Sequence, residues 1–211
     1  MGGPEIHLDF VARYEVIVLE RIPRSLDIPR AVSFPDAVSL DPQRELSNGV
    51  ILEVRPAEGD PWIGVFEFGG YGSPPAAPPQ VLGWPDERSL CVIQEGSGCL
   101  VRTDDIAQNA EIECWTICDV LVVPDRRLVV FADFISLIAY GPDGVAWRSG
   151  RVAWDDVQIV AAEGDELKVS GFDPASGGPA HPVFTVDLRT GRSVDKPYSD
   201  EMRSRDLDRQ D

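Results

Sequence analysis

The sequence predicts an all-β protein of stacked antiparallel sheets. Three segments of similar layout open at Val81, Val120 and Val157, which are 39 and then 37 residues apart. Each continues with a short apolar strand, a turn and another apolar strand, and no long amphipathic helix occurs in residues 1–195. This period is typical of the four-stranded units that are stacked in β-propellers.

Residues 1–68 are expected to form an N-terminal β region. Tyr14 to Glu20 is apolar and β-branched, which favours a strand over a helix. Asn48-Gly49 is a strong hairpin signal, and it leads into a second strand from Val50 to Val54. Pro61 to Phe68 alternates well enough to predict a third strand, whereas the proline-punctuated residues 23–45 are expected to be irregular.

Two segments lack the pattern of a strand. Residues 69–79 are rich in glycine, which frees the backbone, and in proline, which stiffens it, so they predict a loop. A plain connector is one interpretation of this loop, and a functional loop on a rigid sheet is the other. Residues 196–211 are rich in charge and predict a mobile tail, because single helical ion pairs are too weak to fold it; a short docked helix is the alternative.

The three repeats fill residues 80–195, with boundaries at 81–119, 120–156 and 157–195. Alternation is clearest in the third repeat, where Leu167 and Val169 point to one face. At most one helical turn is expected, from Asp104 to Ala110. The strands expected in the three repeats are Ser89–Gln94, Cys99–Thr103, Glu111–Trp115, Leu128–Phe131, Ile135–Tyr140, Val145–Arg148, Glu166–Gly171 and Val183–Leu188.

Two segments carry a family resemblance. Tyr140-Gly141-Pro142-Asp143-Gly144-Val145-Ala146-Trp147 and Val186-Asp187-Leu188-Arg189-Thr190-Gly191-Arg192 resemble blades of quinoprotein-like β-propellers, over about half of the chain. Such blades read strand, Asp, two or three residues, Thr-Gly-Lys/Arg and strand. Three visible units imply a small, partial or open propeller, because closed propellers have at least four blades. The cofactor-contacting residues of quinoproteins have no counterparts here, so the resemblance implies no cofactor. The chain is also similar to uncharacterised bacterial proteins.

The charge of the chain is unusual. Thirty-six acidic and 19 basic residues give a net charge of −17. Such a field repels nucleic acid and anionic membranes and speeds encounter with basic proteins, although a merely solvated acidic surface is the alternative. The N-terminus lacks the pattern of a signal peptide, and the longest apolar run, Leu128 to Tyr140, is too short to span a bilayer. We therefore expect a cytoplasmic protein.

The four cysteines are expected to be buried free thiols. Cys114 and Cys118 are separated by three residues, a wider spacing than in most zinc sites. If Gly96-Ser97 forms the hairpin turn, Cys99 faces Gln94 and does not pair with Cys91. The sequence therefore predicts no metal site and no disulfide.

No catalytic residue is assigned from the sequence. The two histidines, His7 and His181, lie in N-terminal and loop contexts, and no nucleophile elbow, phosphate loop or dinucleotide fingerprint is found. Asp104-Asp105, Asp155-Asp156 and Asp173 are catalytic candidates only because carboxylates are abundant. Most such carboxylates are helix caps or solvated turn residues.

The sequence favours a binding function. Most tryptophans at strand ends, including Trp154, are expected to pack in cores. Tyr71 and Trp84 flank the 69–79 loop and, with Asp104 and Asp105, are candidates for a partner-binding surface, since aromatic anchors beside acidic residues suit a basic protein. The expected function is a non-enzymatic immunity or inhibitor protein that caps a basic toxin or enzyme. The alternatives are a metal-assisted or glycosidic hydrolase with acidic residues near the 69–79 loop, and a structural subunit.

Overall fold

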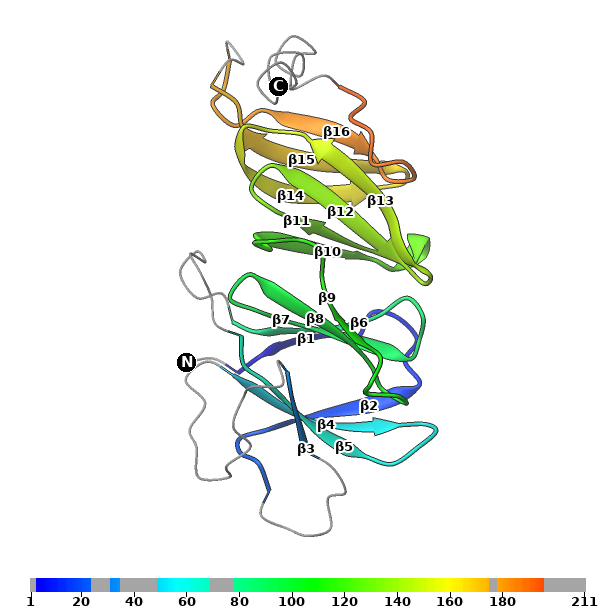
Figure 1. Cartoon of the computed structure of the whole chain (residues 1–211). Coiled ribbons are helices and arrows are strands. Elements are labelled where there is room, and N and C mark those ends of the chain that lie inside the picture. Colours follow the sequence, from blue (N-terminus) through cyan, green and yellow to red (C-terminus); the bar gives the residue numbers. More distant parts are fainter. Residues whose placement is uncertain (1–2, 24–30, 35–48, 69–77, 175–177, 196–211) are drawn as a thin grey trace, which may run out of the picture. The chain divides into compact units, whose positions relative to one another are not determined.

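Apart from one short 3-10 turn, every regular element in the described part of the chain is a strand, which confirms the all-β prediction (Figure 1). The structure, a computed structural model, describes all residues except 1–2, 24–30, 35–48, 69–77, 175–177 and 196–211. In the part it describes, the only helical element is a short 3-10 turn at Pro124–Arg126. The chain divides into two compact units, Met1–Trp115 and Thr116–Asp211.

The first unit contains two sheets. One has five strands in the order β1-β6-β7-β8-β9, and the other has four in the order β2-β4-β5-β3. All neighbouring strands are antiparallel except the parallel pairs β1–β6 and β3–β5. The strands are β1 (Glu5–His7), β6 (Gln80–Gly83), β7 (Ser89–Gln94), β8 (Ser97–Arg102) and β9 (Asn109–Glu111), and β2 (Tyr14–Leu19), β4 (Val50–Pro56), β5 (Trp62–Phe66) and β3 (Ala31–Phe34).

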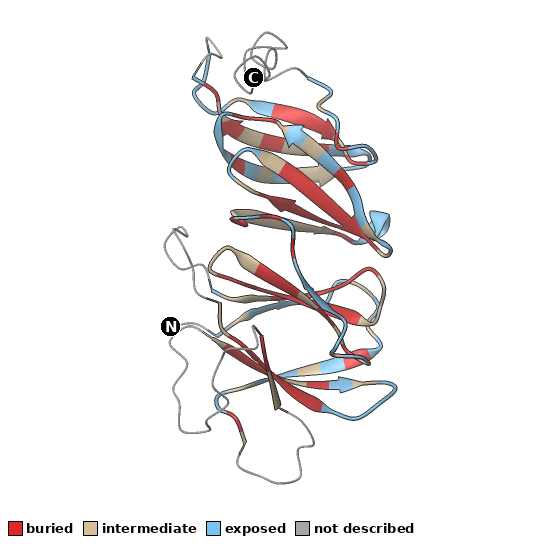
Figure 2. Ribbon diagram, in the orientation of Figure 1, coloured by how far each residue is buried: buried red, intermediate tan, exposed pale blue. Residues whose placement is uncertain are grey.

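The core of the first unit lies between these two sheets (Figure 2). Three aromatic rings organise it: Phe34 stacks on Phe66 at 4.8 Å between ring centroids and meets Trp62 edge-on at 6.2 Å. Valine, leucine and cysteine side chains from β6, β7 and β8 pack against them. Burying these apolar side chains supplies the main driving force that holds the two sheets together.

The second unit also packs two sheets, and every strand pair in it is antiparallel. The strands are β10 (Asp119–Val123), β11 (Leu128–Ala132), β12 (Ser136–Gly141) and β13 (Gly144–Arg151) in the first sheet, and β14 (Asp155–Glu163), β15 (Glu166–Phe172) and β16 (Val183–Asp187) in the second. Its core contains Val130, Trp147, Leu167 and Phe184, drawn from both sheets. The predicted inward face of β15 is confirmed, because Leu167 and Val169 are fully buried.

One turn recurs in both units. It has the pattern Asp-x-x-Ser/Thr, and the aspartate accepts hydrogen bonds from the backbone N–H groups two and three residues ahead and from the Ser or Thr hydroxyl. Such bonds let a short side chain replace backbone partners in a turn. The three examples are Asp86 with Arg88 and Ser89, Asp133 with Ile135 and Ser136, and Asp187 with Arg189 and Thr190.

The β7–β8 hairpin differs from the prediction. Its turn is Glu95–Gly96, with φ of 49° and 76°, so Gln94 faces Ser97 and Cys99 faces Val92. The expected turn at Gly96-Ser97 is wrong because two-residue hairpins favour positive φ at both central residues, and here these are Glu95 and Gly96. Cys91, Cys99 and Cys114 are buried free thiols as expected, whereas Cys118 is partly exposed.

Candidate functional site

The four residues predicted to bind a partner do not form one surface in the described part of the chain. Tyr71 lies outside the described residues. Trp84 follows β6 and is only 2% exposed, so its interpretation as a surface anchor is wrong. A large aromatic side chain at a strand end gains most by packing inward, which is the alternative that the sequence left open.

Asp104 and Asp105 follow β8 and differ in their surroundings. Asp104 Oδ1 accepts a 2.6 Å bond from Arg102 Nε, and Asp104 Oδ2 lies 3.1 Å from Arg88 Nη1. The Arg102 bond, with the charges of both arginines, holds the pKa of Asp104 below its usual range. Asp105 is exposed and accepts bonds from Gln108 Nε2 at 2.9 Å and the backbone N–H of Ala107 at 3.3 Å. Asp104 is thus paired internally, and Asp105 is a turn cap.

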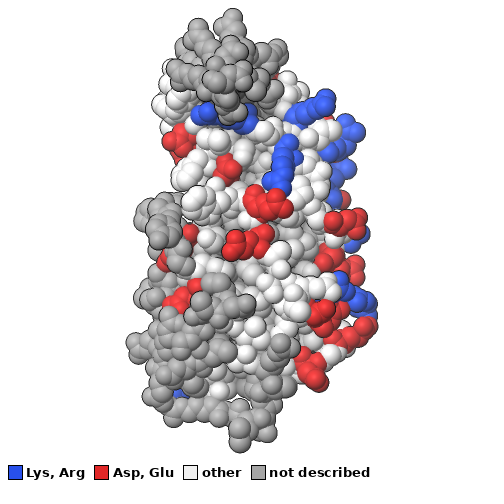
Figure 3. All heavy atoms as spheres, in the orientation of Figure 1, with Lys and Arg blue, Asp and Glu red and all other residues white. Residues whose placement is uncertain are grey.

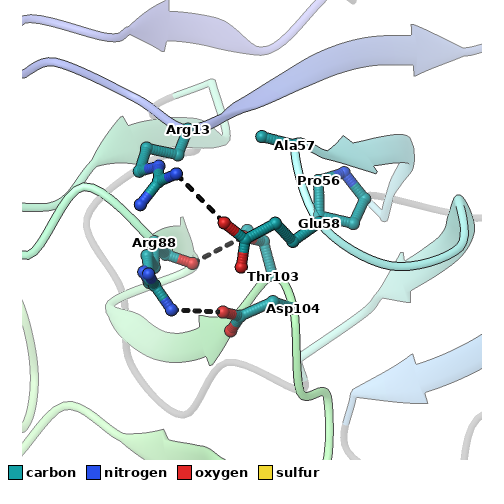
Figure 4. Close-up of a pocket in the computed structure, with 7 residues that line it drawn as sticks. All are labelled: Arg13, Pro56, Ala57, Glu58, Arg88, Thr103 and Asp104. Atoms are coloured by element: carbon teal, nitrogen blue, oxygen red, sulfur yellow. Dashed lines mark hydrogen bonds and ion pairs between the residues drawn. The ribbon is translucent and has the colours of Figure 1, made fainter.

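A small hollow in the first unit lies beside Asp104 (Figure 4). Its space is about 190 Å³, a volume that includes open solvent above it. The backbone of Arg13 ties the two sheets together here, because its N–H donates to Glu87 O at 2.7 Å and its carbonyl accepts from Ala57 N at 2.7 Å. The residues that line it are Arg13, Pro56, Ala57, Glu58, Arg88, Thr103 and Asp104.

The charged groups of this hollow are paired with one another. Arg13 Nη2 lies 3.1 Å from Glu58 Oε1, and Arg88 is paired with Asp104. Sites for small molecules usually have volumes of about 300 to 1,000 Å³, and this hollow stays below that range even when the open solvent above it is counted. The arrangement is that of a polar closure at one end of the sandwich.

The hydrolase alternative depends on residues near the 69–79 loop, of which 69–77 lie outside the described part of the chain. Among the described residues, no group of three or more His, Cys, Asp or Glu side chains is placed to hold a metal ion. The same residues contain no helix that is long and apolar enough to cross a membrane.

A more exposed candidate surface lies in the second unit, and we call it the Trp154 surface. It comprises Asp133, Phe134, Ile135, Trp154, Asp155 and Asp156. Phe134 is 42% exposed and Trp154 is 44% exposed. Ile135 O accepts a 2.8 Å bond from Val152 N, and Phe134 O accepts a 3.3 Å bond from Val157 N. The turn between β11 and β12 is therefore bonded to the chain on both sides of Trp154.

Arg151 fixes the position of Trp154. The carbon atom Cζ of its guanidinium lies 5.0 Å from the centroid of the Trp154 ring, a cation–π distance. Arg151 Nε donates to Ala153 O at 3.1 Å, and Nη2 donates to Trp154 O at 3.1 Å. The indole is thus held in a defined orientation although much of it is exposed.

Carboxylates converge beside these aromatic rings. Burial, followed by the charges of Asp133, Asp156, Asp155 and Asp119, raises the pKa of the Cys118 thiol to about 11. Backbone bonds place these carboxylates at one end of the unit: Cys118 N–H donates to Ala132 O at 2.8 Å, next to Asp133, and Val157 N–H donates to Phe134 O at 3.3 Å, next to Asp156. Their field concentrates cations near the exposed rings.

Three of these four carboxylates have both oxygen atoms bonded. Asp133 holds its turn, and Asp119 accepts from Val120 N at 2.8 Å and from Ile159 N at 2.7 Å. Asp156 bonds to Gln158 Nε2 and His181 Nε2, each at 3.1 Å. Among the described residues, Asp155 uses only Oδ1, which accepts the backbone N–H of Asp156 at 2.8 Å. Asp155 Oδ2 therefore has no bonding partner in the part of the chain that the structure describes.

The sequence patterns do not predict this surface. They make Asp155-Asp156 a catalytic candidate and predict that Trp154 lies in a core. The adjacency of Trp154, Asp155 and Asp156 was a usable signal. Phe134 is 20 residues away from Trp154 in the chain, and only the fold brings the two segments together.

Comparison with known protein families finds no family that matches this chain, and a search of curated proteins finds no relative.

Proposed function

We propose that this protein is a binding module for a basic protein, an immunity or inhibitor protein that caps a basic toxin or enzyme. The observation that supports it most is the net charge of −17 together with an exposed surface where aromatic rings lie among carboxylates. Figure 3 shows acidic side chains over both units on the face drawn, with Lys and Arg residues among them.

The two features have different roles in this proposal. The net charge attracts a basic partner over a distance and raises the association rate by about 10- to 1,000-fold at low salt. Exposed aromatic side chains supply the short-range energy, because tryptophan is among the residues most enriched at the centres of interfaces. Phosphate-rich surfaces carry the same sign of charge as the protein, so we expect no binding to nucleic acid or anionic membranes.

The resemblance to quinoprotein-like blades enters the proposal as a scaffold only. Stacked sheets present turns and strand ends from a rigid framework, which suits a pre-formed binding surface. We further propose that the protein acts in the bacterial cytoplasm. No cofactor is part of this function.

The test is the salt dependence of association. A partner captured from the host is identified and purified, and its association rate constant is measured between about 50 mM and about 500 mM salt. We expect this constant to fall at least tenfold over that range, because screening shortens the reach of the field. A rate that does not respond to salt would contradict the proposal. Turnover of a substrate, or stoichiometric metal in the purified protein, would favour the hydrolase alternative.

A further inference from the structure

We propose that the Trp154 surface recognises an arginine side chain of the basic partner. The guanidinium stacks on the exposed part of the Trp154 ring and pairs with Asp155, while Phe134 and Ile135 cover the aliphatic stem. This inference rests on the proposed function, and it adds the location of the interface and the chemistry that it selects.

The protein already shows that this ring accepts a guanidinium. Arg151 lies over Trp154 at 5.0 Å, and the ring remains 44% exposed. A guanidinium is planar and weakly hydrated, so it stacks on an aromatic face and can pair with a carboxylate at the same time. A lysine ammonium is a compact, strongly hydrated charge that gains less from such a ring.

Asp155 is the carboxylate that is best placed to pair with this arginine. It is exposed, it follows Trp154 directly, and its Oδ2 has no bonding partner among the described residues. Asp133 and Asp156 have both oxygens bonded within the protein. Asp133 and Asp156 contribute to the negative electrostatic field, whereas Asp155 forms a direct charge-assisted hydrogen bond with the arginine.

Two apolar side chains complete the surface. Phe134 is 42% exposed and Ile135 is 37% exposed, and both lie in the turn that is bonded to the chain around Trp154. The three methylene groups of an arginine bury well along such side chains while the charged head stays at the carboxylate. Excluding water from this edge also strengthens the ion pair.

The test uses two capped peptides of equal charge, Gly-Arg-Gly-Arg-Gly-Arg-Gly and its lysine counterpart. Each is titrated into the full-length protein at about 20 mM salt, with affinity measured by calorimetry and the five indole N–H signals followed by NMR. We expect the arginine peptide to bind about two- to fivefold more tightly, the ratio that a cation–π contact contributes. Its signal changes should centre on Trp154, whereas the bonded indoles of Trp62 and Trp147 should stay in place.

Variants separate the two contacts. Trp154→Ala should lower affinity for the arginine peptide about two- to fivefold and remove its advantage over lysine, and Trp154→Phe should keep part of that advantage. Asp155→Asn should weaken both peptides and flatten their salt dependence. Asp143→Asn is the matched control, because it removes the same charge from an exposed turn at the opposite end of β12. Asp143→Asn should change the affinity for either peptide by less than about 1.5-fold, because the length of β12 separates Asp143 from the Trp154 surface.

The two proposals fail in different ways. Equal binding of both peptides, or peptide binding that is salt-dependent but insensitive to Trp154→Ala and Asp155→Asn, would overturn the arginine assignment and leave the proposed function standing. Failure of both peptides to bind even at low salt would contradict the electrostatic attraction on which the proposed function depends.

Discussion

The indole Nε1 of Trp147 donates a 2.6 Å hydrogen bond to the carbonyl oxygen of Leu188, and this bond joins the two sheets of the second unit. The first unit contains a counterpart, in which Trp62 Nε1 donates to Thr103 O at 2.9 Å. In both cases the acceptor lies 41 residues after the tryptophan and just beyond a strand of the opposite sheet. In each unit, a buried indole thus forms a hydrogen bond that links the two sheets across an apolar core.

Replacing Trp147 by phenylalanine tests the value of this bond. Trp147→Phe keeps most of the apolar contact but leaves Leu188 O without its donor, so we expect a loss of about 1 to 3 kcal/mol in the free energy of unfolding. Urea denaturation measures the loss. Trp115→Phe is the control, because Trp115 is 74% exposed, and it should stay within about 0.5 kcal/mol of the parent. Equal effects of the two substitutions would contradict the prediction.

Two glycines with the same backbone conformation allow a second test. Gly191 has φ of 69° and Gly164 has φ of 61°, so alanine is strained at both. A methyl group at Gly191 would overlap the ring of Trp147, whereas one at Gly164 meets nothing within 4 Å. Gly164→Ala should lower the free energy of unfolding by about 1 kcal/mol, because of backbone strain alone. Gly191→Ala should lower it by about 1 to 3 kcal/mol more, because of the added overlap with the ring. Chemical denaturation of the two variants would refute this if the costs were alike.

The ion pairs of Asp104 predict a dependence of stability on pH. Its folded-state pKa is lowered, chiefly by the Arg102 hydrogen bond, so its contribution is present above the unfolded-state pKa of about 3.9. The contribution is lost as the pH falls through the lower folded value. Asp104→Asn should therefore destabilise the protein by about 1 kcal/mol at pH 7 and by less as the pH falls below about 4. Urea titrations of the parent and the variant at pH 7 and pH 3 measure this loss of stability. An equal loss at both pH values would be evidence against the predicted pH dependence.

Cys118 predicts a selective and slow thiol reaction. It is the only one of the four cysteines that is not buried. Its pKa of about 11, which burial and then the nearby carboxylates raise, leaves little reactive thiolate at neutral pH. Iodoacetamide should modify Cys118 alone, with a rate that rises about tenfold per pH unit between pH 7 and 9, and Asp155→Asn should accelerate it. Mass spectrometry identifies the site, and modification of Cys118 as fast as that of a free cysteine at pH 8 would be inconsistent with this environment.

Much of the fold follows from local sequence patterns. The expected strands Ser89–Gln94 and Glu166–Gly171 correspond to β7 and β15, because their apolar side chains suit buried or half-buried sheets. β3 was not expected, since Ala31–Phe34 lies within the proline-rich residues 23–45. Its partner β5 lies about 30 residues further along the chain, and this parallel pairing leaves no local signal.

The candidate surface was harder to predict than the strands. A tryptophan at a strand end has the same sequence signature whether it is buried, as Trp84 is, or exposed, as Trp154 is. What decides between them is which other element covers the ring, and that depends on contacts between distant segments. Asp104 shows the same difficulty, because its pairing with Arg88 requires the β6–β7 connection to lie beside the end of β8.

The recurring Asp-x-x-Ser/Thr turns bear on how the chain reaches its structure. Each turn closes through contacts between residues at most three positions apart, so little chain entropy is lost when it forms. Such turns can arise before any strand finds a distant partner, and they bring the flanking segments into proximity early. The three turns, which form with little loss of entropy, therefore provide several places from which folding can start.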